Sequence, residues 1–429
     1  VQRLLRILLS SYSGMDIRRL LSFVCFLIAI KSGSTGYDYT RAPSIADCES
    51  NLVEVVSKPM FGKVGVELLK RNALSGIGFV FSHMKIFHKL ITLFALASFW
   101  ERRFIKNYLG LHRDCEYNVY CRAFNKITDG MNNLISEEHF YYKSWALFFN
   151  HTYVTSHLDV CATENHFNFS RPADIVLSDI NQRYRQYCKT NSSYLDHNLD
   201  PRSVIYLLDV LKITADVFGG IKRYHTTTHF TDIDDQKIQI PWMKLEGWVW
   251  VGTKYEEGAI CEYVELYRSE IGGGNLHMLY FRPLLDGYSS DNKIKCVESI
   301  LSDLSGYTKL AIDETTTVGQ GSRDVKEIAV PMMDLSTDVD LKPILENDLK
   351  EYFQRPGIYG IEWQAQRLYE LREWEYFNNK PENYDELTPE TEPKIITSLS
   401  SPFVFTIVDK TTGTFLKTGA LLRPGTNVV

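Results

Sequence analysis

Two groups of residues have spacings that could support metal or phosphate chemistry. His225 and His229 flank three threonines, so both side chains would point to one face of an extended segment. A zinc site would need a third ligand, and a zinc hydrolase a general-base glutamate, and neither occurs at the usual spacing. The run Gly272-Gly273-Gly274 does not join a strand to a helix, so it predicts a turn before a strand and not a phosphate-binding loop.

The patterns of nucleophilic catalysis are also missing from the sequence. It has no Gly-x-Ser-x-Gly elbow and no arrangement of Cys and His that is typical of a thiol nucleophile. Its cysteines have no metal-ligand spacing. We therefore predict that the chain is not an enzyme and that it needs neither a metal nor another cofactor.

Composition restricts the class of protein further. The chain has 429 residues, 44% of them apolar, which suffices for one very large core or two of medium size. Its formal net charge is −6 and it has no block of Lys and Arg, so we expect no nucleic-acid binding. No internal repeat or low-complexity stretch interrupts it, which predicts one folded domain.

The N-terminal segment, residues 1–36, has the features of a secretory signal peptide with some upstream sequence. Arg18 and Arg19 precede an apolar run from Leu20 to Ile30, and small residues follow it. The alternative is a short membrane anchor, although the apolar run is too short to span a bilayer comfortably. We expect no stable membrane span and a secreted protein of the extracellular space.

Secretion bears on the cysteines and on three glycosylation sequons. One of the eight cysteines, Cys25, lies within the predicted signal, and the others are odd in number, so they cannot all pair within the chain. Cys115 and Cys121 are close in sequence and could form a disulfide, or both could be buried free thiols. The sequons predict glycan acceptors at Asn150, Asn168 and Asn191.

The order of the apolar patterns predicts an α+β fold. Residues 84–100 are apolar on nearly every side, which indicates a buried helix. Residues 202–214 form a continuous apolar run, typical of a strand buried on both faces. Short strands with turns between them follow from Thr226 to Pro283, and residues 403–422 predict a hairpin. Because two strands are not stable alone, this hairpin must complete a larger sheet.

The C-terminal stretch also resembles the signature of the serpins, the suicide inhibitors of serine proteases. The matching positions are Pro402, Phe403, Thr412, Gly413, Gly419 and Pro424. Segments upstream resemble serpin strands in the same order, at Gly76 to Ser82, Tyr263 to Tyr267 and Asn275 to Pro283. The resemblance covers Phe61 to Pro424 and implies a serpin fold, with a large mixed central sheet, two smaller antiparallel sheets and about eight or nine helices.

The resemblance implies one serpin-like domain over residues 37–429, with a reactive loop at about 375–400. In that family a serine or cysteine endopeptidase cleaves the loop, and the loop then inserts into the main sheet as a new strand. We therefore expect such an endopeptidase as partner, and a monomeric protein. The family spacing, counted back from Pro402, places the bait bond at Thr391-Glu392 and the hinge at Glu375-Tyr376-Phe377-Asn378-Asn379-Lys380-Pro381.

This hinge lacks the Gly, Thr and Ala residues with which the family inserts its loop. Pro381 has no N–H to donate to a sheet, and Phe377 is bulky where the family has a glycine. The sequence therefore predicts that inhibition is weakened or lost, which leaves a binding or carrier role. The alternatives are a working inhibitor with an atypical loop and an unrelated secreted binding protein.

A buried polar cluster under the main sheet is a second expected site. Ser82 matches a family serine, whereas Lys85 and Asp209 stand where the family has a serine and an asparagine. The two opposite charges predict an ion pair that would keep the sheet closed, because opening would leave both charges unpaired in the core. The alternative is that the Lys85 side chain extends outward to solvent.

Overall fold

A computed structural model describes most of the chain in thirteen ranges. These are residues 43–72, 76–97, 99–135, 140–148, 163–166, 171–188, 205–214, 221–224, 229–315, 323–345, 369–370, 372–380 and 397–424. The predicted signal peptide, the three sequons at Asn150, Asn168 and Asn191, the bait bond Thr391-Glu392, and Pro381 lie outside them. The chain divides into residues 1–44 and 45–429, and all the described helices and strands belong to the second unit.

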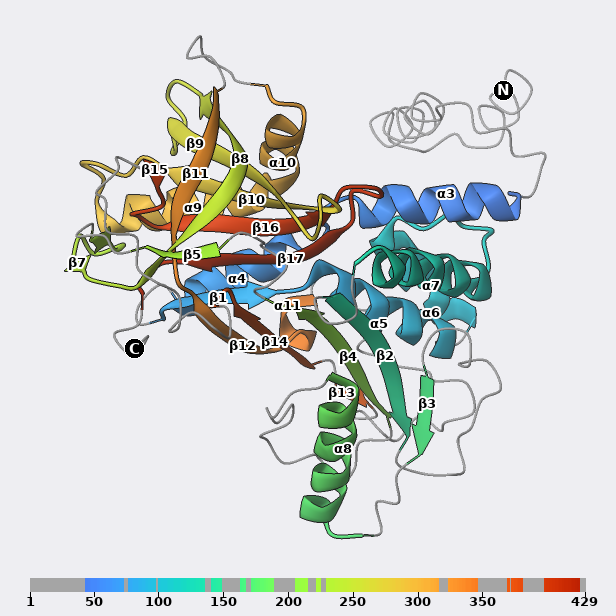
Figure 1. Ribbon diagram of the computed structural model, residues 1–429. Helices are drawn as coiled ribbons and strands as arrows, with labels where there is room; N and C mark the ends of the chain where they lie inside the picture. The colour runs from blue at the N-terminus through green and yellow to red at the C-terminus, as the bar shows by residue number, and fades with distance from the viewer. Residues whose placement is uncertain are drawn as a thin grey trace, which may run out of the picture. The chain divides into compact units, whose positions relative to one another are not determined.

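Five helices make up the first part of this unit. They are α3 (Ile45–Val56), α4 (Gly62–Asn72), α5 (His83–Leu96), α6 (Phe99–Leu109) and α7 (Tyr117–Leu134). The predicted buried helix is α5, which packs against α6, α7, β17 and β4 (Figure 1). It begins at Ser82, whose Oγ accepts a hydrogen bond from Lys85 N at 3.2 Å, a side-chain cap of the kind that satisfies a free N-terminal amide.

A nine-stranded sheet forms the largest layer. Its strands are β1 (Gly78–Phe81), β5 (Ile221–Tyr224), β8 (Trp242–Tyr255), β9 (Tyr263–Ile271), β10 (Leu276–Pro283), β11 (Arg323–Pro331), β15 (Thr397–Ser398), β16 (Phe403–Asp409) and β17 (Phe415–Leu421). The order is β1-β17-β16-β10-β9-β8-β11-β15, with β5 also paired to β8. Every pairing in it is antiparallel except that of β11 with β15.

The predicted C-terminal hairpin is confirmed as β16 and β17 in the interior of this sheet. All residues of both strands are buried, and the hairpin lies between β1 and β10. Gly413 occupies the turn with φ of 72°, a conformation that favours glycine. At Gly419 a side chain does not fit, because a Cβ would lie 2.5 Å from Phe79 O.

Further strands form smaller sheets. One contains β2 (Phe140–Phe148), β3 (Thr163–His166), β4 (Ile205–Ile213) and β13 (Tyr369–Glu370), and another pairs β12 (Asp334–Asp340) with β14 (Arg372–Asn378). A short pair is formed by β6 (Phe230–Thr231) and β7 (Lys237–Ile238). The remaining helices are α8 (Ala173–Cys188), α9 (Ser290–Ser302), α10 (Leu304–Ile312) and α11 (Lys342–Leu345). The α+β class is therefore confirmed.

The smaller sheets meet in an arrangement that bears on function. β13 runs parallel to β4, with Tyr369 opposite Ile205, whereas β14, which starts two residues after β13 ends, pairs with β12. Within the described residues β4 and β14 share no ladder, and β13, which pairs with β4, precedes β14 in the chain. A chain that turned back after β14 could run between β4 and β14, antiparallel to both.

The cysteine pairing differs from both sequence alternatives. Cys115 is bonded to Cys48 and not to Cys121, and Cys121 is in a disulfide as well. A second described bond joins Cys261 to Cys296. The prediction failed because Cys115 precedes α7 and faces α3, which carries Cys48, at a Cα to Cα distance of 5.9 Å. Proximity in sequence does not determine which cysteines meet.

The part of the chain that the structure describes offers neither a membrane span nor a metal site. It has no helix that combines the length and apolar character needed to cross a membrane. It also has no group of three His, Cys, Asp or Glu side chains that could hold a metal. His229 is exposed, and His225 lies outside the described residues.

Candidate functional site

Helix α5 carries four basic side chains into the interior. Lys85, His88 and Lys89 are all at most 2% exposed, and His83, the first residue of the helix, is 4% exposed. Ser82, at its start, is also buried, and its Oγ donates to Leu416 O at 2.7 Å, which fixes the helix against β17. Because a buried ammonium group needs a partner, each lysine requires an anion from another element.

The first anion is Glu375 of β14. Lys85 Nζ lies 3.0 Å from its Oε2, and Lys417 Nζ of β17 lies 2.6 Å from its Oε1. Lys417 also donates to Tyr376 O at 2.8 Å. Each oxygen of this carboxylate thus binds one ammonium group, and the three side chains are no more than 3% exposed.

The second anion is Asp209 of β4. Lys89 Nζ donates to its Oδ2 at 2.8 Å, and His88 Nδ1 lies 3.3 Å from its Oδ1. His88 Nδ1 is also 2.6 Å from the hydroxyl of Tyr142 on β2. This half of the cluster therefore connects α5 to the sheet that contains β2, β4 and β13.

Both carboxylates are charged at neutral pH. Burial alone raises the pKa of Asp209, but Lys89 and then His88 lower it by more, so the pKa is below its ordinary value. Burial also raises the pKa of Glu375, and Lys417 and then Lys85 lower it below its ordinary value. The lysines thus maintain two carboxylate charges in the core.

The predicted pairing within this cluster is wrong, although all three predicted residues are buried. The lysine that binds Asp209 is Lys89, and Lys85 pairs with Glu375, so the two predicted partners belong to different ion pairs. Sequence spacing could have indicated Lys89, because it lies one helical turn after Lys85 on the same apolar helix. No pattern placed Glu375 or Lys417 in the cluster.

The predicted hinge also needs correction. Glu375, Tyr376, Phe377 and Asn378 belong to β14 and pair with β12, so this part is a strand and not the start of an exposed loop. Phe377 is buried, with its ring centroid 4.8 Å from that of Phe405. The four residues Glu375 to Asn378 of the predicted hinge are therefore in a sheet, and Pro381 lies outside the described residues.

Asn379 holds the end of β14 in place by hydrogen bonds. It is fully buried, its Oδ1 accepts from Met333 N at 2.7 Å, and its Nδ2 donates to Pro331 O at 3.1 Å. Its own amide donates to Met333 O at 3.3 Å. The Asn379 side chain therefore bonds to the backbone as a neighbouring strand would, at the connection between β11 and β12.

β15 is also held in place by hydrogen bonds. Thr397 and Ser398 pair with Ile328 and Ala329 of β11, and Leu399 N donates to Ala329 O at 3.0 Å. Arg282 of β10 donates to Ser398 O at 2.6 Å. Described residues on both sides of residues 381–396, Asn379 before them and Thr397 to Leu399 after them, thus bind residues 328–333.

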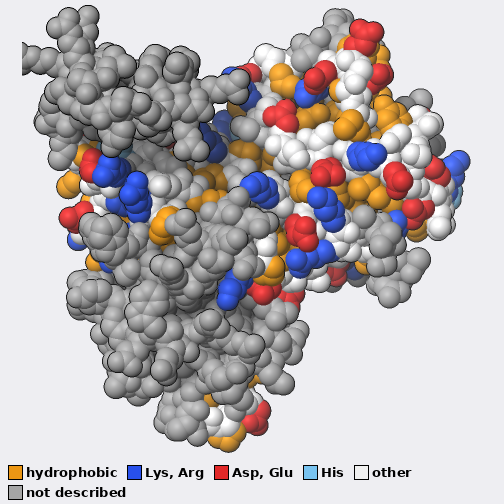
Figure 2. Space-filling model, turned by 180° about the vertical axis from the view of Figure 1, so that it is seen from behind, with side chains coloured by type: hydrophobic (Ala, Val, Ile, Leu, Met, Phe, Trp, Pro, Cys, Tyr) orange, Lys and Arg blue, Asp and Glu red, His pale blue; other side chains and the backbone are white. Residues whose placement is uncertain are grey.

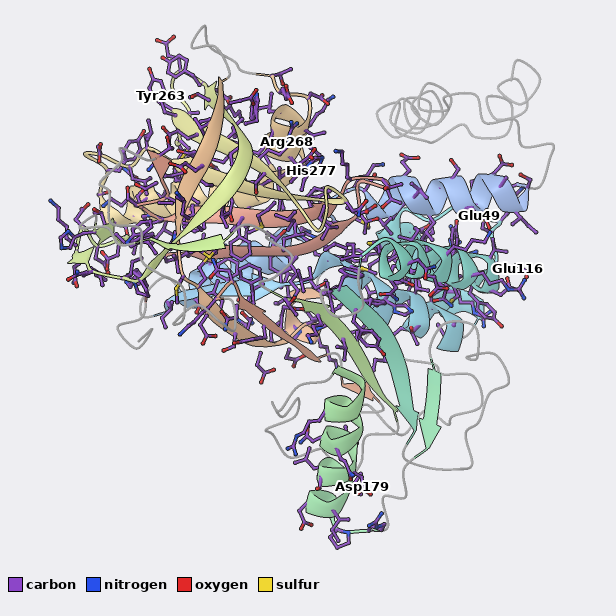
Figure 3. All side chains as sticks on the ribbon, in the orientation of Figure 1. Glu49, Glu116, Asp179, Tyr263, Arg268 and His277 are labelled. Carbon is purple, nitrogen blue, oxygen red and sulfur yellow. A yellow bond between two sulfur atoms is a disulfide. The ribbon has the colours of Figure 1, made fainter. Side chains whose placement is uncertain are left out.

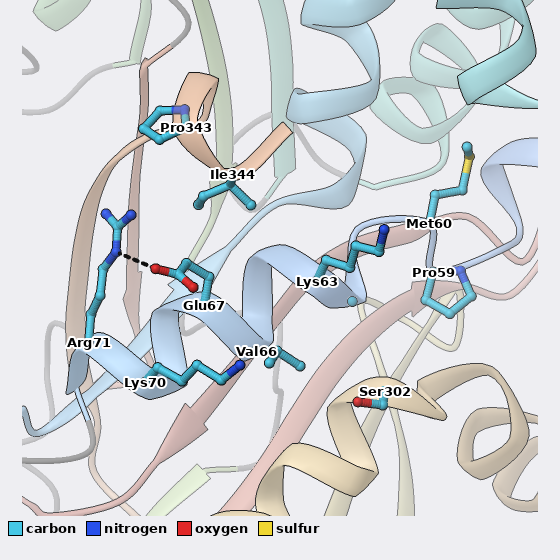
Figure 4. A pocket seen from close by; sticks show the side chains of 11 residues that line it. Pro59, Met60, Lys63, Val66, Glu67, Lys70, Arg71, Ser302, Pro343 and Ile344 are labelled. Carbon is cyan, nitrogen blue, oxygen red and sulfur yellow. Dashed lines mark hydrogen bonds and ion pairs between the residues drawn. The ribbon is translucent and has the colours of Figure 1, made fainter. Parts of the chain in front are cut away.

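A hollow of about 630 Å³ lies beside α4 (Figure 4). Apolar side chains, among them Met60, Val66 and Ile344, line it together with Lys63, Glu67, Lys70 and Arg71. Arg71 pairs with Glu67 at 3.2 Å, and Lys70 is 3.6 Å from Glu298 on α9. These charges bind one another, and no set of polar groups converges on a ligand position, so we assign the hollow no role.

Solved structures resemble this chain over most of its length. Mouse protein-Z dependent protease inhibitor aligns with a TM-score of 0.64 at 15% identity, over 88% of this chain and 100% of that chain. Human thyroxine-binding globulin aligns with a TM-score of 0.64 at 15% identity, over 87% and 99%. A tumour suppressing serpin aligns with a TM-score of 0.64 at 11% identity, over 87% and 100%.

These comparisons identify the fold. No protein-family model matches the chain, and no curated protein matches it in sequence. The described architecture is that of an α+β protein with one large, mainly antiparallel sheet and smaller sheets beside it. The chain has the serpin fold, as the C-terminal signature predicted.

Proposed function

We propose that this chain is a secreted serpin-fold protein that endopeptidases can bind and cleave at residues 381–396, but that inserts the cleaved loop poorly. Its main role would then be binding, by that loop or by another surface. The observation that carries the proposal is that α5 forms two buried ion pairs, Lys85 with Glu375 and Lys89 with Asp209.

Insertion places a new strand between β4 and β14, so β13 must leave β4 and the two strands must move further apart. Helix α5 holds a carboxylate on each of these strands, so a shift of either strand relative to the helix lengthens one ion pair. Breaking a buried pair costs about 3 to 5 kcal/mol, because both charges stay in the core. The strand that would enter also contains Pro381, which cannot donate to a sheet ladder.

Secretion is part of the same proposal. It is supported by the sequence features of residues 1–36 and by the disulfides Cys48–Cys115 and Cys261–Cys296, since disulfides form and persist in oxidising compartments. The glycan acceptors at Asn150, Asn168 and Asn191 and a monomeric state remain predictions. The mouse protein of similar structure is named as a protease inhibitor, and the human one is named as a thyroxine-binding globulin, so proteins named for inhibition and for ligand binding have this fold.

A second candidate is a working inhibitor with an atypical loop. The observation that favours it is the parallel pairing of β4 with β13 and the lack of a described ladder between β4 and β14. A strand position is thus partly open before any cleavage.

Incubation with a panel of serine and cysteine endopeptidases distinguishes the two candidates. Our proposal expects cleavage within residues 381–396 and release of active protease, with no complex that survives SDS. A stoichiometric, SDS-stable complex with any member of the panel would support the second candidate and contradict the first.

A further inference from the structure

Three large apolar side chains are exposed together at one end of the nine-stranded sheet. Ile260 is 56% exposed, Tyr263 43% and Leu284 42%. Tyr263 begins β9 and lies at the outer end of that strand (Figure 3). Leu284 N donates to Tyr263 O at 3.0 Å, so Leu284 is its immediate neighbour. We call Tyr255, Ile260, Tyr263 and Leu284 the apolar tip.

The apolar tip is held rigidly by the elements around it. Tyr255 is opposite Tyr263 in the last pair of the β8 and β9 ladder, and their ring centroids are 4.5 Å apart. The turn between these strands is bonded to α9 through Cys261 and Cys296. Glu256 N also donates to Glu262 O at 3.0 Å, which closes the turn. A partner would therefore find this surface already ordered, so binding would cost little conformational entropy.

Carboxylates surround the apolar tip. The segment from Tyr255 to Tyr263 contains three acidic residues and no Lys or Arg, and the loop after β10 adds one more, so that the acidic residues are Glu256, Glu257, Glu262 and Asp286. Figure 2 shows acidic and hydrophobic side chains next to one another at its upper right, the end of the molecule where β8 and β9 meet.

The lysine that directly precedes this segment is already engaged. Lys254 Nζ lies 3.3 Å from Glu256 and 3.6 Å from Asp303, and it is 4.2 Å from the ring centroid of Tyr307. Its side chain is 17% exposed. Most of the negative charge around the apolar tip is thus available to a partner.

Exposed apolar side chains surrounded by carboxylates exclude several classes of binding partner. Nucleic acids and anionic lipid surfaces would be repelled by the carboxylates. A second copy of the chain would bring the same acidic residues together in a two-fold contact, which is unfavourable. A basic protein segment fits, because its apolar side chains can cover Ile260 and Leu284 while Arg or Lys pairs with the carboxylates and lies over the tyrosine rings.

We propose that the apolar tip is a docking surface for a basic segment of another protein, one in which Arg or Lys residues are interspersed with apolar residues. The surface involves neither residues 381–396 nor the α5 cluster. The inference therefore goes beyond the function proposed above and holds whether or not the protein inhibits a protease.

The test uses the full chain and a fluorescent synthetic peptide of alternating Arg and Leu, with binding measured by fluorescence anisotropy. The same peptide with Glu in place of Arg is the control ligand. We expect the basic peptide to bind, and its affinity to fall as salt is raised, because exposed charges are screened. The acidic peptide should not bind at the same concentrations.

Variants locate the binding surface. Tyr263→Ser and Ile260→Ser should each weaken binding about tenfold, as for central residues of an interface. The double variant Glu256→Gln/Glu257→Gln should weaken it and reduce its salt dependence. Ile175→Ser is the matched control, because Ile175 is 37% exposed but belongs to α8.

Three outcomes would overturn the proposal, given unchanged melting temperatures in the variants. One is equal binding of the acidic and basic peptides. Another is binding that depends on Glu256 and Glu257 but not on Tyr263 or Ile260, which would indicate a purely electrostatic association. The third is an equal loss of affinity in Ile175→Ser.

Discussion

Lys85 and Lys89 lie one turn apart on α5 and bind carboxylates on two different strands, Glu375 of β14 at 3.0 Å and Asp209 of β4 at 2.8 Å. No described ladder joins these two strands. The helix therefore links the two groups of strands that would have to part before a further strand could enter.

Removing one carboxylate should destabilise the native state strongly. In Glu375→Gln, the ammonium groups of Lys85 and Lys417 lose their shared anion while remaining buried, which we expect to cost about 3 to 5 kcal/mol. The control is Glu54→Gln on α3, whose pair with Lys58 is exposed and should contribute at most about 1 kcal/mol. Denaturant unfolding measures both, and equal losses would contradict the assignment.

Replacing Glu375 and both of its lysine partners by apolar residues should release β14 from α5 without unfolding the protein. In Lys85→Met/Glu375→Leu/Lys417→Met no charge is left unpaired, and such replacements are often neutral or stabilising. We expect this variant to form more SDS-stable complex with a protease than the parent chain does. If complex formation is unchanged, the ion pairs do not limit insertion.

Acid should weaken the protein in two stages. His83 is fully buried, and burial lowers its pKa to about 3, so the native state keeps the ring neutral while the unfolded chain takes up a proton below about pH 6.5. The contribution of His83 to the free energy of unfolding is therefore fully present above about pH 6.5. It decreases by about 1.4 kcal/mol per pH unit as the pH falls to about 3. Asp209 and Glu375 add to the loss below about pH 4, because their pKa values are lowered in the native state.

Two variants separate the His83 contribution. His83→Gln should reduce the slope between pH 6.5 and 4 to the part contributed by His277, whose pKa burial also lowers to about 4, whereas Thr418→Val removes the 3.1 Å contact to His83 Nε2 and should lower stability at every pH without changing the slope of the parent chain. Unfolding by urea as a function of pH gives both profiles. A slope in His83→Gln equal to that of the parent chain would contradict the contribution of His83.

A glycine in the central hairpin tests the packing of the large sheet. In Gly419→Ala, the new Cβ would meet Phe79 O at 2.5 Å and the Phe405 ring at 2.6 Å, so we expect a loss of about 1 to 3 kcal/mol. Gly130→Ala on α7 is the matched control, because nothing lies within 4 Å of its Cβ position and helix propensity favours alanine by about 1 kcal/mol. Opposite changes in melting temperature are the expected result.

The sequence predicted the fold well where apolar patterning and turn residues act locally. Alternation from Phe403, with a turn at Gly413, determines a hairpin, and its apolar character requires strands on both sides. The apolar run 202–214 likewise predicted β4, which spans Ile205–Ile213. In both cases the signal depends on residues that are close in sequence.

The site was less predictable because its contacts join distant parts of the chain. Lys85 and Glu375 are 290 residues apart, and no spacing rule selects one carboxylate among the 53 acidic residues. Family spacing placed Glu375 to Asn378 in an exposed hinge, but these residues pair with β12, which no local pattern indicated. The disulfide partner of Cys115 depended on how α3 packs against α7.

Thermal unfolding of the chain after proteolysis within residues 381–396 tests the central claim most directly. If α5 resists the separation of β14 from β4, the cut chain should melt at or slightly below the temperature of the intact chain. A cut chain that melts far above the intact one would mean that the loop has entered the sheet despite the ion pairs, and would contradict our account.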